Sequence, residues 1–206
     1  MTEVYTLYST QGSGNCYKPR LLMHQLGLRF RLVDTSSKDG STRKPEFLAL
    51  NPNGKVPLLI LPDGRPLAES NAMLLHLAEA TAYLPAERYE RALCYQWLFF
   101  EQYSHEPYIA VARSLLHLNP GEGAKASPER LAELHKRGYA AIEAMEKHLA
   151  ANDWFARRYS VADIALYAYT HVAHQGGFHL GPYPAVSAWL TRVAAQPGHV
   201  AIEWRP

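Results

Sequence analysis

The spacing of apolar residues changes once along the 206-residue chain, and this change constrains the fold more than any other feature. Before Tyr83-Leu84-Pro85-Ala86, short runs typical of strands stand between runs with helical spacing. After that segment, the long stretches all have helical spacing. We therefore expect two domains, an α/β domain over residues 1–82 and an all-α bundle over residues 87–206.

In the first domain we expect the order strand, helix, strand, short helix, strand, strand, helix. The early strand–helix–strand unit predicts a parallel pair, and the turn Pro62-Asp63-Gly64 predicts an antiparallel hairpin, which together give a mixed four-stranded sheet. The expected strands are residues 4–8, 29–33, 56–61 and 65–68, and the expected helices are residues 16–25, 45–50 and 70–81. The later helices are expected over residues 87–117, 128–151, 161–174 and 184–195.

Composition and motifs narrow the classes of protein. A formal net charge of +2 is too balanced to indicate a nucleic-acid surface. Two cysteines without a CxxC motif favour a reducing compartment, and we find neither a signal peptide nor an apolar run that could span a membrane, so we expect a cytoplasmic protein. His171 and His174 lack further metal ligands, and there is no glycine-rich nucleotide motif, so we expect neither a metal nor a nucleotide cofactor.

Four short segments, taken in their order and spacing, resemble the glutathione transferase family in its cytosolic bacterial type, with a serine/asparagine active-site loop. The resemblance implies a thioredoxin-like fold for the first domain, glutathione as co-substrate, a small hydrophobic electrophile as acceptor, a role in detoxification and a homodimer. The segments are Ser13-Gly14-Asn15-Cys16-Tyr17-Lys18, Asn51-Pro52-Asn53-Gly54-Lys55-Val56-Pro57, Leu67-Ala68-Glu69-Ser70-Asn71-Ala72 and Ser160-Val161-Ala162-Asp163.

Val56-Pro57 looks like the cis-proline step of that family. Cis bonds make up only about 5–6% of X-Pro bonds, so one at this position would be a specific feature. It would turn the backbone of Val56 outward to pair with the cysteinyl backbone of glutathione, like an added strand. The alternative is an ordinary proline at the start of a strand.

Further glutathione contacts follow from the same resemblance. Ser70 is expected to cap a helix whose exposed N–H groups hold the γ-glutamyl carboxylate, with Glu69 facing the ammonium group. Lys55 and Thr42 are candidates for binding the rest of the tripeptide, with Lys55 at the glycyl carboxylate. Plain helix capping and a solvated lysine are the alternatives.

The loop before the first helix is expected to activate the sulfur. An unperturbed thiol has a pKa of about 8.5, so hydrogen-bond donors and a helix N-terminus are needed to stabilise its anion. We take Ser13 as the hydroxyl donor with Asn15 assisting, and Ser9 as the reserve. The alternative for Ser13 and Asn15 is simple loop and N-cap chemistry.

Cys16 lies three residues after Ser13, where a redox relative would keep a second cysteine. Since position 13 is serine, a dithiol mechanism is not expected. Cys16 remains a reserve site for a mixed disulfide with glutathione, and the alternative is a small residue packed in the first helix. Cys94 is expected in the core.

In the second domain, Ser160 and Asp163 have the spacing of a capping box, which is a folding device. Tyr103, Tyr108 and Arg113 are candidates for the electrophile pocket, with burial in the core as the alternative. The sequence therefore predicts a glutathione transferase. The alternatives are a glutathione-dependent peroxidase or disulfide reductase, and a non-catalytic glutathione-binding or accessory module.

Overall fold

The computed structural model describes residues 4–36 and 38–206. Outside the described residues lie residues 1–3, at the N-terminus, where no signal peptide is expected, and residue 37, in the polar loop expected after the second strand. The chain forms two compact units, Met1–Glu79 together with Pro197–Pro206, and Ala80–Gln196. We call them unit 1 and unit 2.

Unit 1 is built on a four-stranded sheet in the order β2-β1-β3-β4. β1 pairs in parallel with β2 and antiparallel with β3, and β3 is antiparallel to β4, as the sequence predicts. Its elements are β1 (Tyr5–Ser9), α1 (Gly14–Gln25), β2 (Phe30–Asp34), the 3₁₀ turn η1 (Ser41–Arg43), α2 (Pro45–Leu50), β3 (Leu58–Ile60), β4 (Pro66–Ala68) and α3 (Ser70–Ala78).

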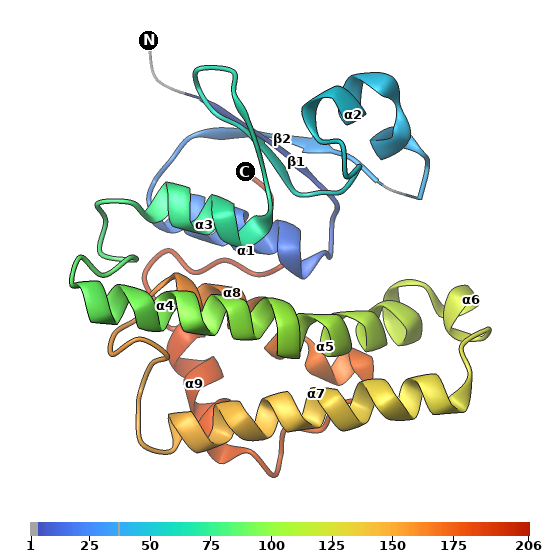
Figure 1. Ribbon diagram of the computed structural model, residues 1–206, viewed down its shortest axis with the longest axis vertical. Coiled ribbons are helices and arrows are strands. Elements are labelled where there is room, and N and C mark those ends of the chain that lie inside the picture. The colour runs from blue at the N-terminus through green and yellow to red at the C-terminus, as the bar shows by residue number, and fades with distance from the viewer. Residues whose placement is uncertain (1–3, 37) are drawn as a thin grey trace. The chain divides into compact units, whose positions relative to one another are not determined.

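The sheet of unit 1 is covered on both faces. Leu7 of β1 is fully buried, and α1 and α3 lie side by side on one face of the sheet (Figure 1). The next residue, Tyr8, points to the opposite face and meets Phe47 of α2 with ring centroids 5.7 Å apart. The sheet is therefore held between the α1/α3 pair and the short helix α2.

The last ten residues belong to unit 1, whereas the sequence places them with the helical domain. Arg20 of α1, only 1% exposed, donates through Nη2 to the carbonyl of Ile202 at 2.9 Å and through Nη1 to that of Trp204 at 2.8 Å. Carbonyls of a segment outside helices and sheets need other donors when they are buried. The guanidinium supplies them, and it thereby fixes residues 197–206 to α1.

Replacing Arg20 by Met is expected to lower the free energy of unfolding by about 2 kcal/mol, because two carbonyls lose charge-assisted hydrogen bonds. Urea unfolding measures the change. Arg31→Met is the matched control, since Arg31 is an exposed residue of β2, and its effect should stay within about 0.5 kcal/mol. Equal losses in the two variants would contradict this role for Arg20.

Unit 2 consists, in the described part of the chain, of helices joined by loops, one of which holds an isolated β-bridge between Ala156 and Arg158. Its elements are α4 (Arg88–Phe100), η2 (Glu101–His105), α5 (Glu106–Arg113), η3 (Ser114–Leu118), α6 (Pro120–Gly123), α7 (Pro128–Leu149), α8 (Val161–Thr170), η4 (Ala173–Gly176) and α9 (Pro184–Ala194). η2 and η3 are π-helical, so the helix expected over residues 87–117 has one wider segment in its interior and ends in a second. The helix expected over residues 161–174 ends at Thr170 and is followed by the 3₁₀ turn η4.

The predicted capping box at the start of α8 is confirmed. Asp163 is fully buried, and its Oδ2 accepts from the backbone N–H of Ser160 at 3.0 Å and from its hydroxyl at 3.1 Å. Its Oδ1 accepts from the N–H of Phe155 at 3.3 Å and from Nε1 of Trp189 at 2.9 Å. One carboxyl group therefore joins the start of α8 to the preceding loop and to α9.

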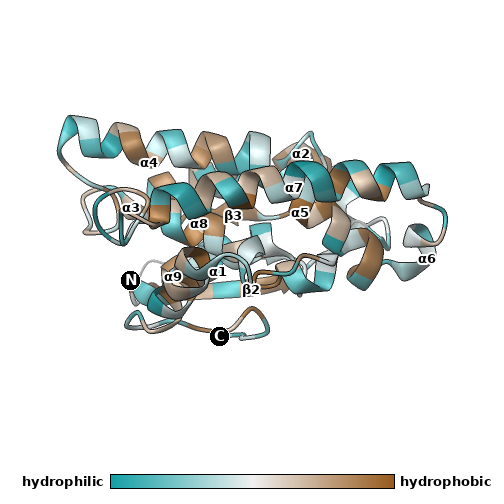
Figure 2. Cartoon of the chain, turned by 90° about the horizontal axis from the view of Figure 1, so that it is seen from below, coloured by the Kyte–Doolittle hydropathy of each residue, from teal (hydrophilic) through white to brown (hydrophobic). Residues whose placement is uncertain are grey.

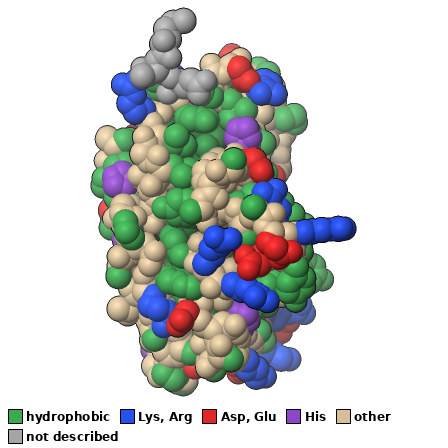
Figure 3. All heavy atoms as spheres, turned by 90° about the vertical axis from the view of Figure 1, so that its left-hand side faces the viewer, with side chains coloured by type: hydrophobic (Ala, Val, Ile, Leu, Met, Phe, Trp, Pro, Cys, Tyr) green, Lys and Arg blue, Asp and Glu red, His purple; other side chains and the backbone are tan. Residues whose placement is uncertain are grey.

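The helices of unit 2 have the surface pattern of an amphipathic bundle. Hydrophilic and hydrophobic residues alternate along α4 and α7 (Figure 2). Acidic and basic side chains are intermixed on the face shown in Figure 3, in keeping with the small net charge.

None of the helices in the described part of the chain combines the length and the apolar character that a membrane span requires.

Candidate functional site

Three loops of unit 1 meet at one edge of the sheet. Tyr8 of β1 pairs with Leu58 of β3, and Leu58 pairs with Ala68 of β4. β3 runs antiparallel to both neighbours, so the residues just before β3 lie beside the residues just after β1 and just after β4. The structure thus brings together the three expected segments, residues 9–16, 55–57 and 69–70.

Ser13 is the N-cap of α1. Its backbone is extended, with φ −72° and ψ 124°, and its Oγ accepts from the N–H of Cys16 at 3.3 Å. A hydroxyl that accepts in this way still has its own proton to donate. Ser13 and Asn15 are both partly exposed, so both can reach a bound molecule at the amino end of the helix.

Cys16 and Ser9 lie behind this edge. Cys16 is fully buried, burial raises the pKa of its thiol, and its Sγ accepts from the N–H of Thr10 at 3.3 Å. Ser9 is 2% exposed. Both reserve candidates are therefore enclosed by protein, and the geometry supports the packed role for Cys16.

The Val56-Pro57 bond is cis, which confirms the expectation for this step. β3 begins one residue later, at Leu58, so Val56 stands just outside the ladder. Among the described residues, neither the N–H nor the C=O of Val56 has a hydrogen-bond partner. The strand edge can therefore be extended there by an incoming peptide backbone.

A tight turn leads into this step. Asn51 donates through Nδ2 to the carbonyl of Lys55 at 2.8 Å, and Gly54 has a φ of 62° that suits glycine. A Cβ on Gly54 would come within 2.9 Å of the carbonyl oxygen of Thr42, so the two segments are closely packed. Lys55 is exposed, whereas Thr42 is fully buried, and its hydroxyl has no partner among the described residues. The position of Thr42 favours a packing role over direct contact with a ligand.

The corner between β4 and α3 differs in one detail from the expectation. Glu69, rather than Ser70, is the N-cap, and Ser70 is the first residue of the helix. Glu69 is exposed and has a φ of 68°, which is unusual for a residue with a side chain and is often found at functional sites. The turn leaves the Glu69 carboxylate in solvent and directs Ser70 inward, where it is 5% exposed.

Ser70 connects the two helices of the edge. Its hydroxyl donates to Oδ1 of Asn15 at 3.2 Å. The same hydroxyl accepts from Nζ of Lys18 at 3.3 Å, and Nζ also donates to Oδ1 of Asn71 at 3.1 Å. Lys18 is fully buried and was not selected by the sequence analysis, because its partners lie more than fifty residues away.

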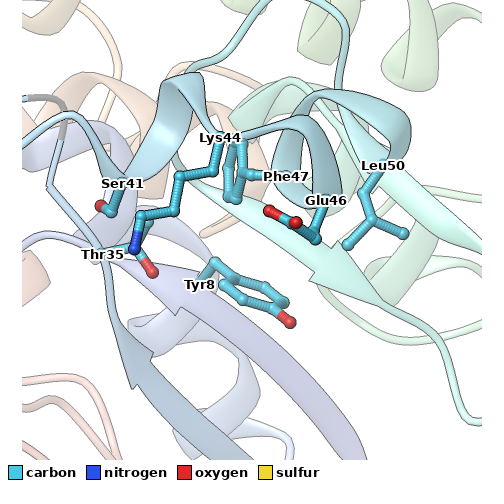
Figure 4. Close-up of a pocket in the computed structure, with 7 residues that line it drawn as sticks. All are labelled: Tyr8, Thr35, Ser41, Lys44, Glu46, Phe47 and Leu50. Atoms are coloured by element: carbon cyan, nitrogen blue, oxygen red, sulfur yellow. The ribbon is translucent and has the colours of Figure 1, made fainter.

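Two cavities flank this edge within unit 1. One, of about 200 Å³, lies between β1 and the η1–α2 segment. Figure 4 shows the Lys44 side chain running toward Thr35, and Glu46 and Leu50 extending from α2 near the ring of Tyr8. The other, of about 150 Å³, adjoins the loop after β1 and is lined by Ser9, Thr10, Gln11, Asp34, Thr35, Ser36 and Asp39.

The three electrophile candidates of unit 2 separate into two groups. Tyr103, which is 82% exposed, and Tyr108 line a cavity of about 300 Å³ beside α7. Arg137, which sequence reasoning missed, also lines it and donates to the hydroxyl of Tyr108 at 3.1 Å. Arg113 is 3% exposed, and its Nε donates to Oε1 of Gln175 at 2.7 Å, so its geometry is that of a core residue.

Comparison with known proteins assigns the chain to a family. The family model for the glutathione S-transferase N-terminal domain matches residues 12–80, and the model for the C-terminal domain matches residues 97–197. The chain belongs to the glutathione S-transferase family. These matches confirm the thioredoxin-like first domain and the helical second domain expected from the sequence.

Known proteins and solved structures are similar to this chain over most of its length. A glutathione S-transferase structure from Pseudomonas fluorescens is 48% identical, with a TM-score of 0.92 over 96% of this chain and 98% of that chain. The disulfide-bond oxidoreductase YfcG of Escherichia coli is 30% identical over 191 residues, which are 89% of this chain and 87% of that protein. Ure2p in complex with glutathione shares the fold, with 22% identity and a TM-score of 0.85 over 96% of this chain and 92% of that chain.

Among the described residues, no group of three or more His, Cys, Asp or Glu side chains is placed to hold a metal. The edge offers the hydroxyls of Ser13 and Ser70, the carboxamide of Asn15, the backbone of Val56 and the exposed carboxylate of Glu69.

Proposed function

We propose that the protein is an enzyme that binds glutathione in unit 1 and stabilises its sulfur as a thiolate, which then attacks a small apolar electrophile. One observation carries the proposal. Ser70, at the start of α3, is hydrogen-bonded at 3.2 Å to Asn15, at the start of α1, and the cis Val56-Pro57 step ends at the same edge. The segments that we propose to bind the carboxylate, the sulfur and the cysteinyl backbone are therefore neighbours, which supports a single binding site for the tripeptide.

Each group of glutathione has a partner of matching chemistry. The Val56 backbone pairs with the cysteinyl backbone. The backbone N–H groups at the amino end of α3, that of Ser70 included, bind the γ-glutamyl carboxylate, and Glu69 binds the ammonium group. Lys55, which is exposed, binds the glycyl carboxylate.

The sulfur then lies at the amino end of α1. There the hydroxyl of Ser13 donates to it, Asn15 assists through its side-chain amide, and the helix N-terminus favours the anion. Lowering the thiol pKa from about 8.5 toward neutrality raises the thiolate fraction several-fold at pH 7. No general base is required, since the proton is lost to solvent.

Disulfide reduction is the second candidate function, and the similarity to YfcG favours it. In this reaction the glutathione thiolate attacks a disulfide, forms a mixed disulfide and releases one thiolate. A second glutathione then displaces the product thiol and leaves oxidised glutathione. The protein needs no thiol of its own, which suits the burial of Cys16.

For the remaining parts of the function we propose the following. Tyr103 and Tyr108 contact the acceptor, while Arg113 supports the core of unit 2. The protein acts in detoxification, in the cytoplasm, as a homodimer of the serine/asparagine-loop type.

Binding and turnover test the proposal separately. Calorimetry should detect glutathione binding to the protein, and turnover with glutathione is then measured with a chlorodinitrobenzene-type acceptor, a hydroperoxide and a small disulfide. Fastest turnover with the aromatic acceptor supports the transferase, and fastest turnover with the disulfide supports the second candidate. Absence of both binding and turnover would contradict the proposal and favour an accessory module.

A further inference from the structure

Lys18 is a buried cation placed one hydrogen bond away from the proposed glutathione site. Its side chain is fully buried between α1 and α3, and Nζ lies 3.3 Å from Oγ of Ser70 and 3.1 Å from Oδ1 of Asn71. Burying an ammonium group is costly, so such a lysine is kept where its hydrogen bonds serve a purpose.

The chemistry of Lys18 fixes the direction of the hydrogen bonds that follow it. An ammonium group donates and never accepts, so Oγ of Ser70 must be the acceptor. The single proton of the Ser70 hydroxyl then points onward to Asn15, 3.2 Å away. Asn15 can meet a donated proton only through its carbonyl oxygen, and its NH₂ group is therefore the end turned away from Ser70.

From this chain of contacts we propose that Lys18 is a positioning residue that sets which end of the Asn15 side chain faces bound glutathione. The inference rests on the proposed function. With Lys18 in place, Asn15 presents hydrogen-bond donors to the sulfur. If the side chain at position 18 can also accept a hydrogen bond, the Ser70 hydroxyl can donate to it instead of to Asn15. The Asn15 amide is then able to turn its NH₂ group toward Ser70 and its oxygen toward the anion.

The consequence concerns the sulfur directly. A thiolate is stabilised by donors and repelled by a carbonyl oxygen, so the orientation of one amide changes the balance between thiol and thiolate. Lys18 never touches the sulfur in this arrangement. Its effect is passed on through the hydroxyl of Ser70 and the amide of Asn15.

The test uses the pKa of protein-bound glutathione, read from the ultraviolet absorbance of the thiolate as the pH is raised. Lys18→Gln should raise that pKa by about one unit, which lowers the thiolate fraction roughly tenfold at pH values below the pKa. Lys18→Arg keeps a donor-only cation and should restore a value near that of the natural protein. In the Asn15→Ala background, Lys18→Gln should cause little further change, because the amide that it controls is gone.

Asn71→Ala is the matched control, since it removes an acceptor of Lys18 other than Ser70 and leaves the Ser70–Asn15 bond in place. It should leave the pKa of bound glutathione unchanged. A Lys18→Gln protein that only melts at a lower temperature, with the thiol pKa unaltered, would overturn the inference while the proposed function stands. A shift of equal size in the Asn15→Ala background would also overturn it, and no glutathione binding by the natural protein would remove both.

Where Lys18→Gln does not fold, Lys18→Met in the presence of saturating glutathione provides the second variant. Methionine does not donate to Ser70, so Oγ of Ser70 becomes able to accept from the Asn15 NH₂ group, which would then turn away from the sulfur, and the expected rise in thiol pKa is the same. The split between kcat and KM is a further readout. Loss of thiolate lowers kcat at neutral pH, whereas a purely structural change at the binding edge raises KM.

Discussion

Replacing Asp163 by alanine is expected to lower the free energy of unfolding by about 4 kcal/mol, the largest stability loss that we predict. The carboxyl group is fully buried and accepts hydrogen bonds from two groups of Ser160, one of Phe155 and one of Trp189. Alanine leaves these donors without an acceptor inside the protein. The lost cap at the start of α8 adds to the cost.

Urea unfolding followed by circular dichroism measures the loss. Asp153→Ala is the matched control, because the Asp153 side chain is 80% exposed and lies 3.9 Å from its partner Arg192. Its loss should be about 0–1 kcal/mol. A loss below about 1 kcal/mol for Asp163→Ala as well would show that the network contributes little to stability.

The pH dependence of stability gives Asp163 a second readout. Burial raises its pKa to about 7, against the effect of hydrogen bonds from Trp189, Phe155 and Ser160. The folded protein therefore holds this proton more tightly than the unfolded chain, whose aspartate pKa is about 3.9. The resulting stability is present below about pH 4 and is lost as the pH rises through about 7. This part of the slope should vanish in Asp163→Ala.

The largest expected effect on activity is that of Ser13. Ser13→Ala should lower kcat/KM for glutathione-dependent turnover about a hundredfold and raise the pKa of the bound thiol, because the sulfur anion loses a hydroxyl donor at the amino end of α1. The helix also loses its cap, which by itself costs about 0.5–2 kcal/mol of stability. Stopped-flow pH profiles with the best acceptor measure the catalytic part.

Ser127 offers a control for the lost cap. It is the N-cap of α7, and its Oγ accepts from the N–H of Arg130 at 3.2 Å, much as the Oγ of Ser13 accepts from Cys16 at 3.3 Å. Ser127→Ala should reproduce the stability loss and leave the thiol pKa as it is. If Ser13→Ala behaves in the same way, Ser13 is a helix cap only and has no part in the chemistry.

Much of the fold follows from short-range signals in the sequence. Pro45 at the first position of α2 and the turn after Leu50 give the bounds of that helix, which match the expectation. Ser160 and Asp163, three residues apart, predict their own capping box. Such features depend on neighbours within one or two turns, which a single sequence contains in full.

Contacts between distant segments could not be predicted in the same way. Arg20 binds carbonyls more than 180 residues further along the chain, so nothing near it in the sequence indicates that the last ten residues return to unit 1. The bonds from Lys18 to Ser70 and from Ser70 to Asn15 likewise depend on how α1 meets α3.

Arg113 shows a third limit. Sequence periodicity assumes a constant number of residues per turn, but the π-helical segment η2 precedes α5 and rotates its faces relative to α4. Tyr103 is consequently exposed and Arg113 is buried. The constant spacing of a regular helix starting at Glu87 does not predict the faces on which these two side chains lie. The signal for the π segment is not evident in the local composition.

The return of residues 197–206 to α1 also bears on how the protein is made. A ribosome completes α1 and the sheet strands early, then translates all of unit 2, and only afterwards releases the segment that satisfies Arg20. The hydrogen bonds from Arg20 to the carbonyls of Ile202 and Trp204 can therefore form only after the whole of unit 2 has been synthesised.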